Sequence, residues 1–333
     1  MHTNPPVLTR RWKACCATAI AALLCATTPG AQAQAYPAKP VRVIVGFTAG
    51  GPADTMARII GQKVPEIGGQ PVIIENRPGG NSYIAGEVVV RATPDAHVFW
   101  FSAVSALSFT YLLMAKPPID PERDLALVTQ AVSVPQIFVA HPSLQVKGLQ
   151  DLARLAKQRP GQINTAIIGP GGVIHLGTEL FKITAGINMN NVSYKGGANV
   201  ITDLAGGHVE VALLDVPAIM SYLPTGRIRP LAVTSGARIP QLPQVPTTTE
   251  AGYPAVRSDS WYGIATTAAT PSALVQRAND LWRAAVQAPE TQQRLAALGA
   301  TSMGTSVEDF RTFRAAETRK WGEVIKKIGF KLE

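Results

Sequence analysis

The sequence predicts an α/β protein built from two lobes. Segments rich in β-branched and aromatic residues alternate with segments of helical periodicity along most of the chain, as expected of sheets with largely parallel strands flanked by helices. A glycine-rich turn occurs twice, at residues 46–51 and 169–172, each time between a strand-like and a helix-like segment. The 333 residues are enough for two lobes of ordinary domain size.

The first segment, residues 1–33, has the pattern of a secretory signal peptide. Arg10, Arg11 and Lys13 precede an apolar stretch at 14–25, and small residues flank the expected cleavage site at 31–33. This stretch is shorter than the ~20 residues that span a bilayer. Twin-arginine export is an alternative, but the usual apolar pair after the arginines is missing, which favours ordinary secretion. We therefore expect a cleaved signal and an exported chain.

The positions of the cysteines and the distribution of charge exclude some kinds of site and partner. Cys15, Cys16 and Cys25 all lie in the predicted signal, so no disulfide and no cysteine metal site is expected in the exported part. Lysine and arginine number 31 against 22 acidic residues, but the basic residues are scattered, without the aromatic interleaving of a nucleic-acid groove. The mild positive field favours an anionic small molecule and no nucleic-acid partner.

The first lobe is predicted from residue 36. Residues 41–47 are β-rich, and residues 52–64 carry Met56, Ile59, Ile60 and Val64 at the spacing of one buried helix face. Further strands are expected at 71–75 and 97–102, and a further helix at 82–92.

The second lobe is predicted from residue 136. Its expected strands and helices follow one another in the alternating manner of α/β units. The strands are expected at 136–140, 163–168, 192–194, 209–214 and 231–234, and the helices at 149–157, 173–185 and 199–205.

The last segment is helical from residue 270, after a predicted strand at 261–266. Its apolar faces need a sheet to cover, and the sheet of the first lobe is the natural one. We therefore expect a discontinuous first lobe of 36–135 and 258–333, a second lobe of 136–257, and a hinge made of the two crossover segments.

The glycine turns are the predicted ligand contacts. Gly50 and Gly51 permit a close approach, Pro52 suits the first helical position, and the helix start favours an anion. A well-capped helix with nothing bound is the alternative, and Asp54 is expected to cap its own helix. Walker and dinucleotide patterns are absent, which favours a carboxylate over a phosphate. The repeat at 169–172 suggests two turns facing each other across a cleft.

Metal and cofactor chemistry finds no support in the sequence. Beyond the predicted signal, histidines occur at His97, His141, His175 and His208, without the close spacing of a metal site. His175 follows the second glycine turn, where capping or packing is favoured over general-base work. We expect no metal and no cofactor.

Nucleophilic catalysis is also disfavoured. There is no G-x-S-x-G elbow, and neither Ser82 nor Ser102 has an evident base partner in the sequence. Asp215, after a predicted strand, is either a hinge or ligand residue or an ordinary turn aspartate. An exported hydrolase using one of the two serines remains an alternative.

Short motifs along the chain carry a family resemblance. They are GFTAGGPAD at 46–54, ENRPG at 75–79, ATPD at 92–95, HPSL at 141–144, YKGG at 194–197, DLAGG at 203–207, LAVTS at 231–235 and VPT at 245–247. In this order they resemble the Bug-type solute receptors, the periplasmic substrate-binding components associated with tripartite tricarboxylate transporters.

The resemblance implies a two-lobed periplasmic-binding-protein fold of type II-like form, in which each lobe has a central, mainly parallel sheet. It implies a monomeric, non-enzymatic receptor in the periplasm that closes on a small carboxylate and delivers it to a membrane transporter. A ligand-sensing partner of a signalling membrane protein is the alternative. The implied ligand-binding residues are Phe47, Thr48, Ala49, Gly50, Gly51, Asn81, Ser82, Gly169, Gly171 and Gly172, with His175 supporting the second turn and Asp215 near the crossover.

The sequence departs from the family pattern at two places. Gly172 stands where a serine or threonine is common, and the polar stretch usual after the third strand is replaced by AVSAL at 103–107. Both changes remove hydrogen-bonding side chains. They favour a less polar ligand, an aromatic or short-chain carboxylate.

Overall fold

A computed structural model describes residues 36–194 and 196–332. The predicted signal peptide at 1–33 lies outside these residues. All the elements described below belong to the compact unit of residues 39–333. In the described part of the chain, no helix combines the length and the apolar character needed to cross a membrane.

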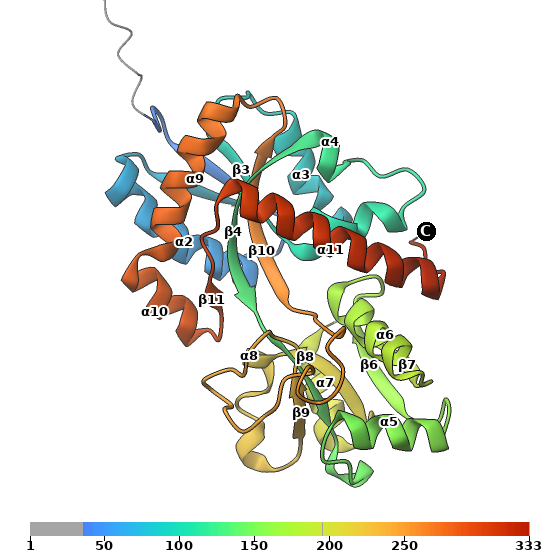
Figure 1. Cartoon of the computed structure of the whole chain (residues 1–333). Coiled ribbons are helices and arrows are strands. Elements are labelled where there is room, and N and C mark those ends of the chain that lie inside the picture. Colours follow the sequence, from blue (N-terminus) through green and yellow to red (C-terminus); the bar gives the residue numbers. More distant parts are fainter. Residues whose placement is uncertain (1–35, 195, 333) are drawn as a thin grey trace, which may run out of the picture. The chain divides into compact units, whose positions relative to one another are not determined.

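A six-stranded sheet holds the N-terminal strands, in the order β11-β4-β10-β3-β1-β2 (Figure 1). Its β1 pairs in parallel with β2 and β3, whereas β10 runs antiparallel to β3 and β4. The strands are β1 (Val41–Val45), β2 (Val72–Asn76), β3 (Val98–Ala103), β4 (Leu125–Val134), β10 (Ser260–Thr267) and β11 (Thr301–Ser302). The associated helices are α2 (Pro52–Gly68), α3 (Tyr83–Val90), α4 (Pro121–Asp124), α9 (Ser272–Gln287), α10 (Pro289–Ala297) and α11 (Val307–Ile328).

Aromatic side chains on β3 join this sheet to helices on both faces. Successive strand residues point to opposite faces, so Phe99 meets Trp282 of α9, with ring centroids 5.5 Å apart, and Trp100 meets Tyr83 of α3 at 6.1 Å. All four rings are buried. The C-terminal helices α9 and α11 therefore pack on the N-terminal sheet, where both contact β4.

A five-stranded sheet holds the middle of the chain, in the order β7-β6-β8-β5-β9. Its β6 pairs in parallel with β7 and β8, and β5 runs antiparallel to β8 and β9. The strands are β5 (Gln136–Ala140), β6 (Asn164–Ile168), β7 (Asn190–Tyr194), β8 (Val211–Asp215) and β9 (Arg229–Val233). The helices are α5 (Leu149–Gln158), α6 (Val173–Ala185), α7 (Gly197–Gly206) and α8 (Val216–Ile219).

The expectation of mainly parallel sheets is wrong, because both sheets are mixed. Strands β4, β5 and β10, at which the chain passes between the sheets, all take part in antiparallel pairs, as does the short strand β11. β4 is separated from β5 by Pro135 alone, and β10 brings the chain back from the five-stranded sheet. A parallel neighbour needs a long crossover, and these direct passages have none. The sequence analysis missed β4 altogether.

The two passages between the sheets are hydrogen-bonded to each other. Gln136 donates from Nε2 to Ser260 Oγ at 3.0 Å and accepts at Oε1 from Ser258 Oγ at 2.8 Å. All three side chains are buried. These hydrogen bonds join the start of β5 to the start of β10, and a hinge at these segments stays a prediction.

Candidate functional site

A buried carboxylate supports the first glycine turn, between β1 and α2. Asp54 is 3% exposed and accepts hydrogen bonds from the Gly50 N–H at 2.9 Å, Arg58 Nε at 2.9 Å and Asn76 Nδ2 at 3.0 Å. Asn76 Nδ2 also donates to the Phe47 carbonyl at 3.1 Å. Asp54 therefore ties the turn to its own helix and to the end of β2.

The charge of Asp54 is stabilised by these partners. Burial acts to raise the pKa of Asp54, but the hydrogen bonds from Arg58, Gly50 and Asn76 outweigh burial and hold the pKa below its ordinary value. The carboxylate is thus ionised at neutral pH.

A strained segment follows β2. Gly79, Gly80, Asn81 and Ser82 all have positive φ, with values of 53° for Asn81 and 76° for Ser82. Residues other than glycine rarely adopt this region, and such strain clusters at functional sites. Ser82 Oγ lies 3.1 Å from Ser102 Oγ. Position 46 must be glycine here, because a Cβ at Gly46 would lie only 1.7 Å from Ser82 Oγ. The segment is held against the first turn.

A neutral imidazole supports the second glycine turn, between β6 and α6. Gly169 and Gly171 have positive φ, and the Gly171 N–H donates to His175 Nδ1 at 3.0 Å. The Gly172 N–H donates to the Gly169 carbonyl at 2.7 Å. Burial lowers the pKa of His175 against the opposing effect of Glu179, which keeps Nδ1 available as an acceptor at neutral pH.

The two glycine turns meet at a cavity of about 340 Å³, which we call the glycine-turn cavity. It collects residues that follow β1, β2, β3 and β6, and ligands commonly bind at the carboxyl ends of strands in α/β sheets. Its lining is Gly46, Phe47, Gly79, Asn81, Ser82, Ala103, Ser105, Ala106, Thr110, Ile168, Gly169, Pro170, Gly171, Gly172 and Leu332. Of the predicted site residues, the cavity brings together Phe47, Asn81, Ser82, Gly169, Gly171 and Gly172.

The other predicted site residues lie elsewhere. Gly50 and Asp215 line a second cavity, of about 410 Å³, which also includes Tyr262. Thr48, Ala49 and Gly51 line neither cavity, and His175 stands behind the second turn. Phe47 and Tyr262 meet edge to face at 6.4 Å, so an aromatic pair stands between the two cavities.

The second cavity carries a carboxyl group with a raised pKa. Burial raises the pKa of Asp215 to about 6, and hydrogen bonds from Ser260 and Gln136 offset only part of that effect. Ser260 Oγ donates to Asp215 Oδ1 at 2.7 Å. An ionised Asp215 repels an anion, so electrostatics favours the glycine-turn cavity as the place for one.

Neutral donors line the glycine-turn cavity. Its described lining residues include no charged side chain, and the polar ones are Asn81, Ser82, Ser105 and Thr110. The first N–H groups of α6 lack intrahelical partners and add the positive end of the helix dipole. The amides of Gly50, Gly169, Gly171 and Gly172 are bonded within or beside their own turns instead. The glycine amides therefore hold the conformation of the turns that form the site.

Ser105, Thr110 and Leu332 line the cavity but are not among the predicted site residues. Ser105 and Thr110 belong to the short helical turns η2 (Ser105–Phe109) and η3 (Thr110–Leu113) after β3. Ser105 stands within the AVSAL stretch that the sequence analysis treats as a loss of polar partners. Leu332 carries no local signal, because it reaches the cavity only through the fold.

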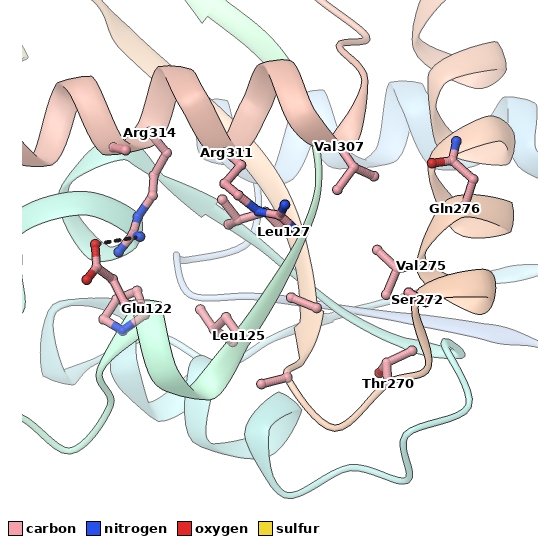
Figure 2. Close-up of a pocket in the computed structure, with 14 residues that line it drawn as sticks. Glu122, Leu125, Leu127, Thr270, Ser272, Val275, Gln276, Val307, Arg311 and Arg314 are labelled. Atoms are coloured by element: carbon pink, nitrogen blue, oxygen red, sulfur yellow. Dashed lines mark hydrogen bonds and ion pairs between the residues drawn. The ribbon is translucent and has the colours of Figure 1, made fainter.

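A larger cavity of about 590 Å³ lies away from the glycine turns, among α4, α9 and α11 (Figure 2). It contains none of the predicted site residues, and its arginines are engaged within the protein. Arg314 donates from Nη1 to Glu122 at 3.1 Å and from Nε to the Leu107 carbonyl at 2.9 Å, and Arg311 pairs with Glu308 at 2.9 Å. The Arg311–Glu308 pair is exposed and lies within one helix, whereas Arg314 joins α11 to α4 and keeps a buried Nη2 without a partner among the described residues.

Catalytic groups are not assembled around the two serines considered above. The partner of Ser82 Oγ is Ser102 Oγ, and no histidine or carboxylate within residues 36–194 and 196–332 hydrogen-bonds to either hydroxyl. The same residues contain no cluster of histidine, cysteine or acidic side chains suited to a metal ion.

Known proteins share this fold and sequence over most of their length. The family model described as "Tripartite tricarboxylate transporter family receptor" matches residues 56–330. Protein BugT of Bordetella pertussis is 32% identical over 303 residues, covering 91% of this chain and 93% of BugT.

Solved structures agree with the sequence relatives. "R. palustris Rpa4515 with adipate" is 33% identical, with a TM-score of 0.75, and the match covers 89% of this chain and 99% of that one. "MatC (Rpa3494) from Rhodopseudomonas palustris with bound malate" is 25% identical, with a TM-score of 0.72 and coverage of 87% and 100%. The periplasmic binding protein BugD is 28% identical, with a TM-score of 0.72 and coverage of 90% and 100%.

Proposed function

Because the chain belongs to the tripartite tricarboxylate transporter receptor family, we propose that it captures a small carboxylate in the periplasm. The ligand is bound between two lobes that close on it, and the receptor then delivers it to a membrane transporter. The protein acts as a monomer and performs no catalysis. Its exported form begins after the signal segment at 1–33.

The glycine-turn cavity carries this proposal. It joins turns of both sheets and offers neutral donors with an apolar surround, the arrangement typical of small-molecule sites. Similar chains have been solved with adipate and with malate, and both ligands carry carboxylates. A carboxylate suits a site of hydroxyl and amide donors at a helix start.

The proposed contacts divide between binding and support. Asn81 and Ser82 donate to one carboxylate from the first lobe, and the start of α6 faces the ligand from the second. Phe47 packs against the body of the ligand. Residues Thr48, Ala49, Gly50, Gly51, Gly169, Gly171, Gly172, His175 and Asp215 keep the turns and the crossing segments in place around it.

Closure follows from the two passages between the sheets. We propose a first lobe of 36–135 and 258–333, a second lobe of 136–257, and bending at the segments that Gln136 and Ser260 join. The lobes are connected there by short extended segments, which suit a hinge.

The test removes one donor without disturbing the backbone. Asn81→Gly deletes the amide and keeps a residue that tolerates positive φ. A hydrogen bond to a charged group is worth roughly 1.5 to 3 kcal/mol, so we expect carboxylate affinity to fall about 10-fold or more. Affinity is measured by calorimetry with the carboxylate that gives the largest thermal shift in a panel of adipate, malate, citrate and benzoate.

Gln145→Gly is the matched control. Gln145 also has positive φ, at 55°, but it is exposed and does not line the cavity. It should leave affinity unchanged. Equal affinity of Asn81→Gly and the parent protein would show that Asn81 does not bind the carboxylate. If no acid in the panel binds, the proposed function is wrong.

A further inference from the structure

The segment after α11 returns to the glycine-turn cavity. α11 ends at Gly329, which has a positive φ of 63°, and the chain turns there into Phe330, Lys331 and Leu332. α11 itself contacts α6, the helix that follows the second glycine turn (Figure 1). We call Phe330–Leu332 the tail.

The tail packs directly on the second glycine turn. The Phe330 ring meets His175 edge to face at 5.2 Å, on the side chain that accepts the Gly171 N–H. A Cβ at Gly171 would lie 3.1 Å from Phe330 Cε1 and 3.5 Å from Leu332 Cδ2. The turn can approach this closely because it carries a glycine.

The tail is also attached to the other side of the cavity. The Leu332 N–H donates to the Leu113 carbonyl at 2.9 Å, and Leu113 Cδ1 would lie 3.0 Å from a Cβ at Gly171. Leu113 ends η3, which begins at Thr110 of the cavity lining. Leu332 is therefore held at a fixed place between the turn and η3.

Leu332 lines the cavity, whereas Lys331 beside it is exposed. We infer that the tail is the end wall of the ligand site and that Leu332 sets the length of ligand that fits. The inference rests on the proposed function, because it assigns a role within the same site. An apolar wall accepts a methylene chain and leaves a second carboxylate no partner at that point.

The expected size of the effect follows from pocket discrimination. One methylene too many or too few in an apolar pocket changes selectivity by roughly 10- to 200-fold. Truncating Leu332 removes part of the wall and makes room for a longer chain. Enlarging the side chain has the opposite effect.

The test uses a series of straight-chain monocarboxylates from butyrate to octanoate, titrated by calorimetry into the exported chain. Leu332→Ala should move the preferred acid to a longer chain, with a relative gain of about 10-fold for an acid one methylene longer. Leu332→Phe should move the preference to a shorter acid. Lys331→Ala, on the exposed neighbour, should leave the preferred length unchanged.

The outcomes separate this inference from the proposed function. If the parent protein binds the series and both Leu332 variants keep its preferred length, Leu332 does not set the ligand length. The proposed receptor function is then unaffected. A uniform loss of affinity at all lengths in both Leu332 variants also overturns the wall, because a general packing role explains it. If the parent protein binds no acid of the series or of the earlier panel, the proposed function itself fails.

Discussion

The two glycine turns have similar sequences but different supports. At the first turn, the ionised side chain of Asp54 accepts from the turn, from its own helix and from β2. At the second turn, the neutral ring of His175 accepts from Gly171, and Phe330 packs against that ring. The first support is electrostatic and comes from Asp54 and Arg58, near the turn in the sequence, with Asn76 added by the pairing of β1 and β2. The second is uncharged and depends on a residue far along the chain.

The glycines of a turn before a helix are therefore not enough to make that turn rigid. The glycines provide the backbone conformation, and a neighbouring side chain must hold it. Where that side chain is ionised with good partners, the turn withstands changes of pH near neutrality. Where it is an imidazole, protonation removes the acceptor, so the second turn is the pH-sensitive one.

The largest effect is expected at the first turn. Asp54→Ala leaves the Gly50 N–H and the Asn76 amide without their buried acceptor and breaks the pair with Arg58. We expect a loss of about 3 kcal/mol in the free energy of unfolding, measured in urea. A loss below about 1 kcal/mol would show that the carboxylate does not hold the turn.

The sign of the pH dependence checks the same carboxylate. The pKa of Asp54 is lowered in the folded state, so its stabilisation is present above the unfolded pKa and is lost as pH falls through the folded pKa. The difference between the parent protein and Asp54→Ala should therefore shrink at acid pH. A constant difference would contradict the assigned protonation.

The pKa of Asp215 is raised in the folded protein, whereas the pKa of Asp54 is lowered. With a folded pKa of about 6, ionisation of Asp215 destabilises the protein as pH rises from the unfolded pKa through about 6. Asp215→Asn should raise the free energy of unfolding at pH 8 by about 2 kcal/mol and have little effect near pH 4. Urea unfolding at the two pH values measures this, and a destabilised variant at pH 8 would contradict the burial argument.

The smallest effect is expected at the second turn. His175→Ala removes a neutral acceptor, so we expect a loss of about 1 kcal/mol at pH 7.5. The pKa of His175 is lowered in the folded state, so its stabilisation is complete above about 6.5 and falls as pH drops below that value. The parent protein should lose more stability than the variant between pH 7.5 and pH 5.5. Parallel losses would mean that another group controls the pH response.

Features that depend on one short stretch of the chain could be predicted from the sequence. The succession of strand, glycine turn, proline and helix is a short-range pattern, so the turn at 46–51 follows from it. The lining residues Phe47, Asn81 and Ser82 came from the family resemblance instead. Strand β4 was missed because its buried run lacks the alternation of a half-exposed strand. The antiparallel pairing of β4 with β10 was missed with it.

The long-range parts could not be predicted. Leu332 reaches the cavity because α11 contacts α6 and the tail turns back at Gly329. Asp54 looks like a helix cap in the sequence, and its contact with Asn76 exists only once β1 and β2 pair. Gly50 and Asp215 were grouped with the other site residues, but the structure places them at the second cavity.

The central claim is that the glycine-turn cavity binds a carboxylate through neutral donors. The most direct measurement is calorimetric titration of adipate, and of its diamide, into protein that has been unfolded, stripped of bound molecules and refolded, with malate and benzoate and their amides as further pairs. We expect saturable binding of at least one acid and none of its amide. We also expect that about 1,000 times the dissociation constant of that acid adds about 4 kcal/mol to stability. Equal binding of acid and amide, or no binding of any acid by the stripped protein, would contradict the central claim.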